Sequence, residues 1–272
     1  MKKFLASIIA VVLAVSGLSV ISITANAATI FISGNYEYTV NSDDTVNIAG
    51  YKGIATDITI PSQILNKNVV KISANSFYNN STLTSVKMPN TIKVVGSMAF
   101  HNCTKLSKVT LPSNLTEIGY NAFEGTTALT TITIPKTVTT AGNNVFNGSA
   151  LKTAAIENGA TAVADNLFSN AKNLTKVTIP NTVKKVGSMS FYHCEKLSSV
   201  ALPNTLTEIG YSAFNGTTAL TTITIPKTVT KAGIDVFEDS GLKTATIENG
   251  ATTVADNHFS NAKNLTKVTI PN

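Results

Sequence analysis

The sequence predicts a repeat solenoid, predominantly β with short turns and little helix, because three features recur at one period. Phenylalanines recur every 22 or 23 residues, which is the period of a stacked array with one unit per layer. Apolar and small polar residues alternate after the leucine that opens each unit, as in a strand with one buried face. A proline usually follows and ends the strand, because proline has no N–H for a ladder. The phenylalanine column comprises Phe77, Phe100, Phe123, Phe146, Phe168, Phe191, Phe214, Phe237 and Phe259.

The first 27 residues predict a secretory signal peptide. Lys2 and Lys3 precede an apolar stretch to about Val20 and an Ala-Asn-Ala site that ends at Ala27. An uncleaved membrane anchor is the alternative, because the apolar stretch approaches the length of a bilayer span. Cleavage after Ala27 lowers the net charge from +6 to +4, since it removes the two lysines, and leaves no membrane span. We therefore expect an exported protein that is secreted or held at the cell surface.

Residues 28–60 are expected to form an N-terminal hairpin cap. Alternating apolar positions at Tyr36, Tyr38 and Val40 precede a polar turn over residues 41–44 and a second alternating segment. A hairpin here would cover the open edge of the first layer, which a stacked array needs for solubility.

Residues 61–272 are expected to form the solenoid, and the unit that begins at Leu106 shows its parts. A short strand after Leu106 is followed by Pro112, by a second apolar pair in an outer extended piece, and then by Gly119 and Phe123. We expect Gly119 to permit a backbone bend that residues with a Cβ resist. A polar loop then leads to the leucine of the next unit.

A longer repeat overlies the short one. Residues 83–173 and 174–264 match at about three quarters of their positions, which indicates a duplication of four units. The units that begin at Leu151 and Leu242 depart from the pattern, because a glutamate replaces the proline and an alanine replaces Val or Ile. We expect these two layers to be thinner or locally irregular. The replacing residues are Ala154, Glu157, Ala245 and Glu248.

The repeat L-x-x-V-x-I-P-x-x-V-x-x-I-G-x-x-A-F-x-x-C resembles a known family, and the best matches run from Leu83 to Cys103 and from Leu106 to Phe123. It is similar to the BspA-like leucine-rich repeat of bacterial surface proteins. The resemblance covers about residues 35–272. It implies a leucine-rich-repeat horseshoe and adhesion to host or matrix proteins or to other cells.

Cys103 and Cys194 occupy the same position of units that are four repeats apart. Four strand spacings amount to about 19 Å, whereas a disulfide needs Cα atoms within about 7 Å. We therefore expect two separate, buried, free thiols. His101 and His193 lie near these cysteines and form the best match to a Cys/His nucleophile pair, but loop histidines beside structural cysteines are the favoured interpretation.

Other residues that could perform chemistry are dispersed. Glu117 and Glu124 are the acids that a polysaccharide-cleaving parallel β-helix would need on adjacent coils of one face, and only an accident of loop geometry would bring them there. We expect no catalytic residue, no metal and no cofactor. The mild positive charge is spread along the chain and favours a mixed solvated surface over a nucleic-acid partner.

The exposed side chains of the inner strands form the expected binding face, because curved arrays bind through their concave surface. This face is rich in threonine, carries scattered lysines and has no aromatic residue, which favours weak contacts repeated along a polymer or fibrous partner. A strand face with no partner is the alternative. Tyr120 and Tyr211 are exposed aromatic candidates, or edge packing. The candidate face comprises Lys87, Lys108, Thr110, Thr131, Thr133, Lys176, Thr178, Thr222, Thr224 and Lys267.

The favoured function is that of a secreted or cell-surface, non-catalytic protein that binds an extracellular protein or glycan polymer. The resemblance implies that this binding serves adhesion. Two other functions stay open. One is a structural spacer within a larger surface protein, and the other is a secreted carbohydrate-active enzyme.

Overall fold

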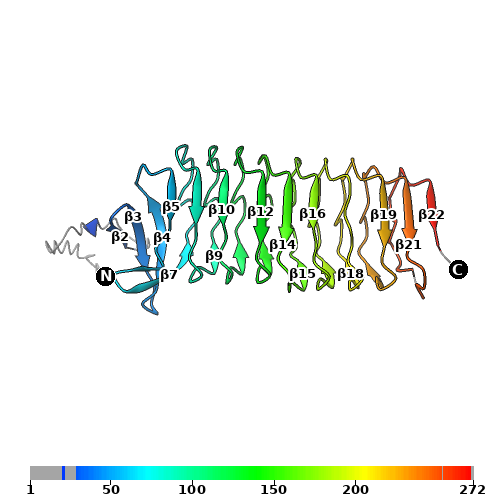
Figure 1. Cartoon of the computed structure of the whole chain (residues 1–272), viewed down its shortest axis with the longest axis horizontal. Helices are drawn as coiled ribbons and strands as arrows, with labels where there is room; N and C mark the ends of the chain where they lie inside the picture. The colour runs from blue at the N-terminus through cyan, green and yellow to red at the C-terminus, as the bar shows by residue number, and fades with distance from the viewer. Residues whose placement is uncertain (1–19, 22–28, 253, 271–272) are drawn as a thin grey trace, which may run out of the picture.

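The chain forms a stack of β-turns and short strands that extends along one axis (Figure 1). The computed structural model describes residues 20–21, 29–252 and 254–270. These residues contain strands and turns and no helix, so none of them forms a helix that could cross a membrane. The predicted leucine-rich-repeat solenoid is confirmed. Most of the predicted signal peptide lies outside the described residues and stays a prediction.

Antiparallel strands cover the N-terminal end of the stack, which confirms the predicted hairpin. Strand β3 (Tyr36–Val40) pairs with β4 (Val46–Tyr51), and β2 (Ile30–Ser33) adds a further antiparallel strand beside β3. The short strand β1 (Val20–Ile21) pairs with β2. Strand β4 then pairs in parallel with the first outer strand, so the cap continues directly into the solenoid.

Short inner strands line one side of the stack. The inner strands pair in parallel with their neighbours except at two breaks described below. One further layer, at Ser199, makes only an isolated bridge to Lys176. The first inner strand precedes the first leucine-opened unit, so the stack begins one layer earlier than the leucine count indicates. The inner strands are β5 (Asp57–Thr59), β8 (Ser85–Lys87), β10 (Lys108–Thr110), β12 (Thr131–Ile134), β14 (Thr153–Ile156), β16 (Lys176–Thr178), β19 (Thr222–Ile225), β21 (Thr244–Ile247) and β22 (Lys267–Thr269).

Two-residue outer strands run along another side and form two parallel groups that separate between β13 and β15. The first outer strand is longer and makes a second hairpin with β6 (Gln63–Ile64). The outer strands are β7 (Lys67–Ile72), β9 (Val94–Val95), β11 (Glu117–Ile118), β13 (Thr140–Ala141), β15 (Ala162–Val163), β17 (Lys185–Val186), β18 (Glu208–Ile209) and β20 (Lys231–Ala232).

The phenylalanine column forms a continuous ring stack inside the solenoid. Neighbouring ring centroids lie between 4.8 Å (Phe77 to Phe100) and 6.0 Å (Phe237 to Phe259), with small interplanar angles. The rings from Phe100 to Phe237 are fully buried, as are the unit-opening leucines from Leu83 to Leu242. Each layer therefore buries its apolar residues only against the layers before and after it.

Gly119 serves close approach between layers, and the predicted need for a bend is wrong. It has no positive φ. A Cβ placed on it would lie 2.4 Å from the backbone nitrogen of Ser97 in the preceding layer. Gly119 N donates to Val95 O over 2.7 Å, so the two backbones approach too closely for a side chain. The next glycine of this column, Gly142, stands in the same relation to Tyr120.

Two turn positions in each complete layer have positive φ, and sequence reasoning missed both. One lies two residues after the glycine position and the other two residues after the phenylalanine. Asn, Asp and Gly adopt this conformation most readily and fill most of these positions. Met98 (φ 55°) and Met189 (φ 53°) are exceptions whose side chains do not favour it.

The prediction that the divergent layers are locally irregular is wrong for their inner strands, but the outer ladder does break between β13 and β15, where the first divergent layer places its outer strand. That these layers are thinner stays a prediction. Strands β14 and β21 each have four residues and pair with both neighbours. Glutamate has the N–H that proline lacks, so Glu157 N donates to Ile134 O and Glu248 N to Ile225 O, each over 2.9 Å. The substitution therefore extends the ladder by one bond.

Candidate functional site

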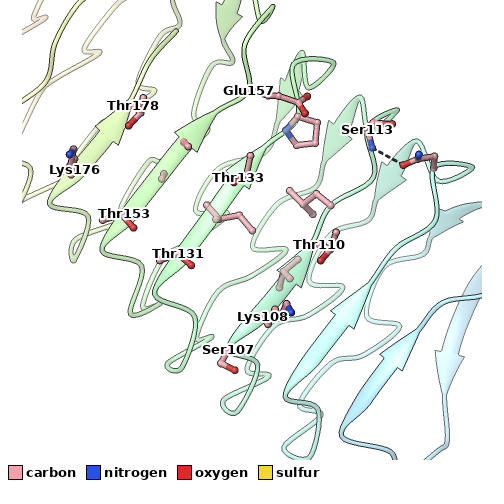
Figure 2. A pocket seen from close by; sticks show the side chains of 17 residues that line it. Ser107, Lys108, Thr110, Ser113, Thr131, Thr133, Thr153, Glu157, Lys176 and Thr178 are labelled. Carbon is pink, nitrogen blue, oxygen red and sulfur yellow. Dashed lines mark hydrogen bonds between the residues drawn. The ribbon is translucent and has the colours of Figure 1, made fainter.

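The outward side chains of the inner strands form one exposed surface, here called the strand face. Alternation along each strand points every second side chain outward, as in β12, where Thr131 and Thr133 are exposed and Ile132 and Ile134 are buried. Figure 2 shows this arrangement on neighbouring strands. All ten residues of the predicted binding face lie on this surface and are exposed. The structure therefore places them on one surface, on strands β8, β10, β12, β16, β19 and β22.

The strand face carries positive charge. Lys87, Lys108, Lys176 and Lys267 lie within inner strands, and the exposed Lys152 and Lys243 come directly before β14 and β21. The inner strands from β8 to β22 contain no acidic residue.

Acidic groups lie only at the margins of the strand face. Asp57 is in the first inner strand, where hydrogen bonds from Ser85 and Thr56 hold the pKa of its carboxyl below the usual value. Glu157 and Glu248 lie where the divergent strands end. Their carboxylates accept hydrogen bonds from the backbone nitrogens of Lys136 (3.1 Å) and Lys227 (3.2 Å).

Two breaks in the inner sheet open hollows in the strand face. Strand β10 pairs with β8, and β12 pairs with β14, but no ladder joins β10 to β12 in the described part of the chain. A hollow of about 670 Å³ lies there and reaches the half-buried Val109 and Leu111 (Figure 2). The backbone N–H and C=O groups along these two strand edges have no partner strand.

The second break recurs at the duplicated position. The layer at Ser199 is not paired with β19, and a hollow of about 560 Å³ reaches the half-buried Val200 and Leu202. A third hollow of about 240 Å³ lies over β5, β8 and β10. The strand face is thus a shallow, polar surface with successive hollows along the stack.

The tyrosine candidates lie away from the strand face. Tyr120 and Tyr211 are 43% and 44% exposed and follow the outer strands β11 and β18. Their carbonyls accept hydrogen bonds from the backbone nitrogens of Met98 and Met189, each over 2.8 Å. Each tyrosine therefore stands beside a methionine on the outer corner, separate from the threonine and lysine positions.

The cysteines are buried in the interior. The Cys103 thiol donates to Phe77 O over 3.0 Å, and the Cys194 thiol donates to Phe168 O over 3.2 Å. Burial raises the pKa of Cys103 to about 12 and raises the pKa of Cys194 further above its ordinary value. A buried thiol held in its neutral form is a poor nucleophile.

His101 faces a carboxylate and not the thiol of Cys103. Its Nε2 lies 3.4 Å from Glu124 Oε2, and its ring stacks on Tyr78 with centroids 4.9 Å apart. Glu124 Oε1 also accepts a hydrogen bond from Asn147 Nδ2 over 2.8 Å. These side chains form a polar ladder across four neighbouring layers, one residue after each phenylalanine.

The acids considered for an enzyme do not pair across neighbouring layers. Glu117 in β11 stands in register with Val94 and Thr140, neither of which is acidic. Glu124 has His101 and Asn147 as its neighbours in the column. Among the residues described, no group of three or more His, Cys, Asp and Glu side chains could hold a metal ion.

Sequence reasoning missed two exposed lysines at the edge of the strand face. Lys152 and Lys243 precede their strands, so alternation within the strand did not include them. Their signal was their equivalent place in the two copies of the duplication. Nothing in the sequence indicated the open edges at the sheet breaks, because strand pairing depends on how neighbouring layers pack against each other.

A family profile described as BspA type leucine rich repeat region matches residues 55–174 and 161–272. Among solved structures, a leucine-rich repeat protein from Bacteroides ovatus ATCC 8483 is 26% identical. That alignment covers 89% of this chain and 71% of that chain, with a TM-score of 0.54.

Two further structures are similar over different lengths. A leucine-rich repeat protein from Bacteroides capillosus ATCC 29799 is 30% identical over 47% of this chain and 98% of that one, with a TM-score of 0.44. A leucine rich cell surface protein from Faecalibacterium prausnitzii A2-165 is 23% identical over 90% and 95%, with a TM-score of 0.42. Curated proteins gave no match. The profile spans the solenoid from β5 onward, and the chain therefore belongs to the BspA-type leucine-rich repeat family.

Proposed function

We propose that this protein is secreted or displayed at the cell surface and binds extracellular macromolecules, without catalysis, through the strand face. The observation that carries this proposal is the exposed row of threonines and lysines along the inner strands from β8 to β22. Membership of the BspA-type family supports a surface role, and the predicted signal peptide supports export.

The form of the strand face favours an extended partner. Its hollows are shallow and follow one another along the stack, whereas a small-molecule site is a deep, mostly apolar cleft. Many weak contacts repeated along a polymer produce high avidity without any single strong site. Adhesion to host or matrix proteins, or to other cells, is the role that this geometry suits best.

Binding of the mature chain to immobilised matrix proteins, glycan polymers and whole cells tests the proposal. The blocked variant combines Thr131→Gln, Thr133→Gln, Thr222→Gln and Thr224→Gln, which place larger neutral side chains on the exposed face. The control makes the same substitution away from the strand face, as Thr139→Gln with Thr230→Gln, at exposed positions beside the outer strands. It is compared with the two-site variant Thr131→Gln with Thr222→Gln as well as with the blocked variant.

We expect binding that saturates, that falls in the blocked variant and that persists in the control. Equal binding by the two variants would place the contact elsewhere and contradict the proposal. No binding to any member of the panel would favour the structural spacer. Release of sugars from a glycan polymer would favour the carbohydrate-active enzyme.

A further inference from the structure

We infer that the partner of the strand face is a linear acidic polysaccharide, with carboxylate or sulfate groups, that lies along the stack across successive inner strands. This inference rests on the proposed function and names the class of its ligand. Three features of the strand face carry it, which are its charge, the direction in which that charge is arranged and the hydrogen-bonding groups between the charges.

Six exposed lysines, which lie in the inner strands or directly before them, form three pairs on neighbouring layers. Lys108 lies opposite Ser85 in the ladder, so Lys87 stands diagonally across from it. Lys176 lies opposite Thr153, and Lys152 directly precedes that threonine. Lys267 lies opposite Thr244, and Lys243 directly precedes it. The last two pairs are equivalent in the duplicated blocks.

These six lysines are available for a ligand. In the described part of the chain, none of the six lies within ion-pair distance of a carboxylate. Lysines elsewhere on the solenoid do make such contacts, as Lys172 does with Glu195 (2.7 Å) and Lys185 with Glu208 (3.0 Å). The strand face therefore has a net positive charge that complements an anionic partner.

The pairs follow the axis of the stack. The first two pairs are three layers apart, or about 14 Å at the usual strand spacing, and the second and third are four layers apart, or about 19 Å. A ligand that contacts all three pairs must cross the inner strands and extend along the long axis of the stack (Figure 1). A polymer with a charge on every repeat unit can do this without matching one fixed spacing.

The groups between the lysine pairs suit a polyhydroxylated chain. Threonine hydroxyls fill the intervening strands β12 and β19, and the hollow between β10 and β12 exposes backbone donors and acceptors. Both kinds of group can donate and accept hydrogen bonds with sugar hydroxyls.

The strand face has no aromatic ring on the inner strands from β8 to β22. Proteins that bind single-stranded nucleic acids stack the bases on aromatic rings, and the hot spots of protein interfaces are rich in aromatic residues. Charge and hydroxyl contacts therefore dominate recognition here, and an acidic polysaccharide is the polymer that satisfies both.

Surface binding of the mature chain to defined polymers tests the inference. The probes are heparin for sulfate, hyaluronan for carboxylate, dextran as a neutral polysaccharide, and polyglutamate and single-stranded DNA as other polyanions. The charge variant combines Lys108→Gln, Lys176→Gln and Lys267→Gln. The matched control combines Lys93→Gln, Lys184→Gln and Lys231→Gln, which remove the same charge at exposed positions beside the outer strands.

We expect heparin or hyaluronan to bind more tightly than dextran, polyglutamate and DNA, and the preferred acid group identifies the source. Affinity should fall about tenfold in the charge variant, because three exposed ion contacts contribute roughly 1.5 kcal/mol together. It should also fall as sodium chloride rises, and it should change little in the control.

Any of three results would overturn the inference. Dextran could bind as tightly as the acidic polysaccharides, or polyglutamate or DNA could bind more tightly than they do. The charge variant and the control could also lose equal affinity. If the blocked threonine variant loses a ligand that the charge variant retains, the proposed function stands and the polysaccharide assignment fails. If neither variant loses any ligand, both fail.

Discussion

His258 makes the last complete layer sensitive to pH, and replacing it with leucine should remove that sensitivity. The His258 side chain is 3% exposed, and neither ring nitrogen has a hydrogen-bond partner among the described residues. Desolvation lowers the pKa of His258 below 6.5. The duplicated position holds Leu167, which is 1% exposed, so this column accepts a leucine of similar burial.

The sign of the pH effect follows from which state binds the proton. Well above pH 6.5 both the folded and unfolded states hold a neutral imidazole, and His258 contributes no pH dependence. As the pH falls below 6.5, the unfolded state binds a proton that the folded state resists, so the free energy of unfolding decreases. The loss accumulates as the pH falls, until the pH reaches the lowered pKa of the folded state.

His258→Leu should therefore stabilise the protein at both ends of this range. At pH 7.5 we expect a gain of about 1–3 kcal/mol, because the variant no longer buries unpaired ring nitrogens. Between pH 6.5 and pH 5.5 the gain should grow, because only the wild type has a buried imidazole that resists protonation. The reciprocal Leu167→His should introduce the same pH dependence four layers earlier.

Urea unfolding at pH 7.5 and pH 5.5 measures the free energy of unfolding of the wild type and of His258→Leu. The other titrating groups are the same in both proteins, so the difference in pH dependence between them belongs to His258. Hydrogen exchange of peptides within residues 254–264 follows the last layer separately, since a solenoid can open one layer at a time. Equal pH dependence in the wild type and in His258→Leu would refute the reasoning.

Three other predictions concern the interior and the turns. Gly119→Ala should lower the free energy of unfolding by about 1–3 kcal/mol, because its Cβ would lie 2.4 Å from a backbone atom. The control Ala164→Gly, in the same column, should lower it by only about 0.5–1 kcal/mol. Equal losses for the two variants on urea unfolding would contradict the close-approach argument. Met98→Asn should raise the melting temperature, because asparagine tolerates the positive φ at a gain of up to about 1 kcal/mol; a lower melting temperature would show that packing of the methionine outweighs its backbone cost. Cys103 should not react with a thiol reagent at pH 8 in the folded protein and should react after unfolding in urea, because burial raises its pKa to about 12; rapid reaction of the folded chain would contradict its burial.

Much of the candidate surface was predictable because strand alternation is a local property. Thr131 and Thr133 were assigned to the exposed face from the apolar residues between them, and the structure places them there. The hairpin at β3 and β4 was predictable for the same reason, since its turn and its alternation lie within a short segment. Glu157 shows where this reasoning stops, because the loss of proline indicated an irregular layer although the N–H it restored lengthened the ladder.

The sequence by itself determined the number of layers opened by leucine, the phenylalanine stack, the burial of the cysteines and the alternating threonines and lysines of the strand face. These features follow from the 22- or 23-residue period and from the alternation of apolar and polar residues, and both patterns recur in successive repeats. The tertiary structure alone decided where the inner sheet breaks, why Gly119 must lack a side chain and which lysines of the described residues make no ion pair. Each of these depends on the distance between neighbouring layers, and that distance is set by packing across residues far apart in the chain.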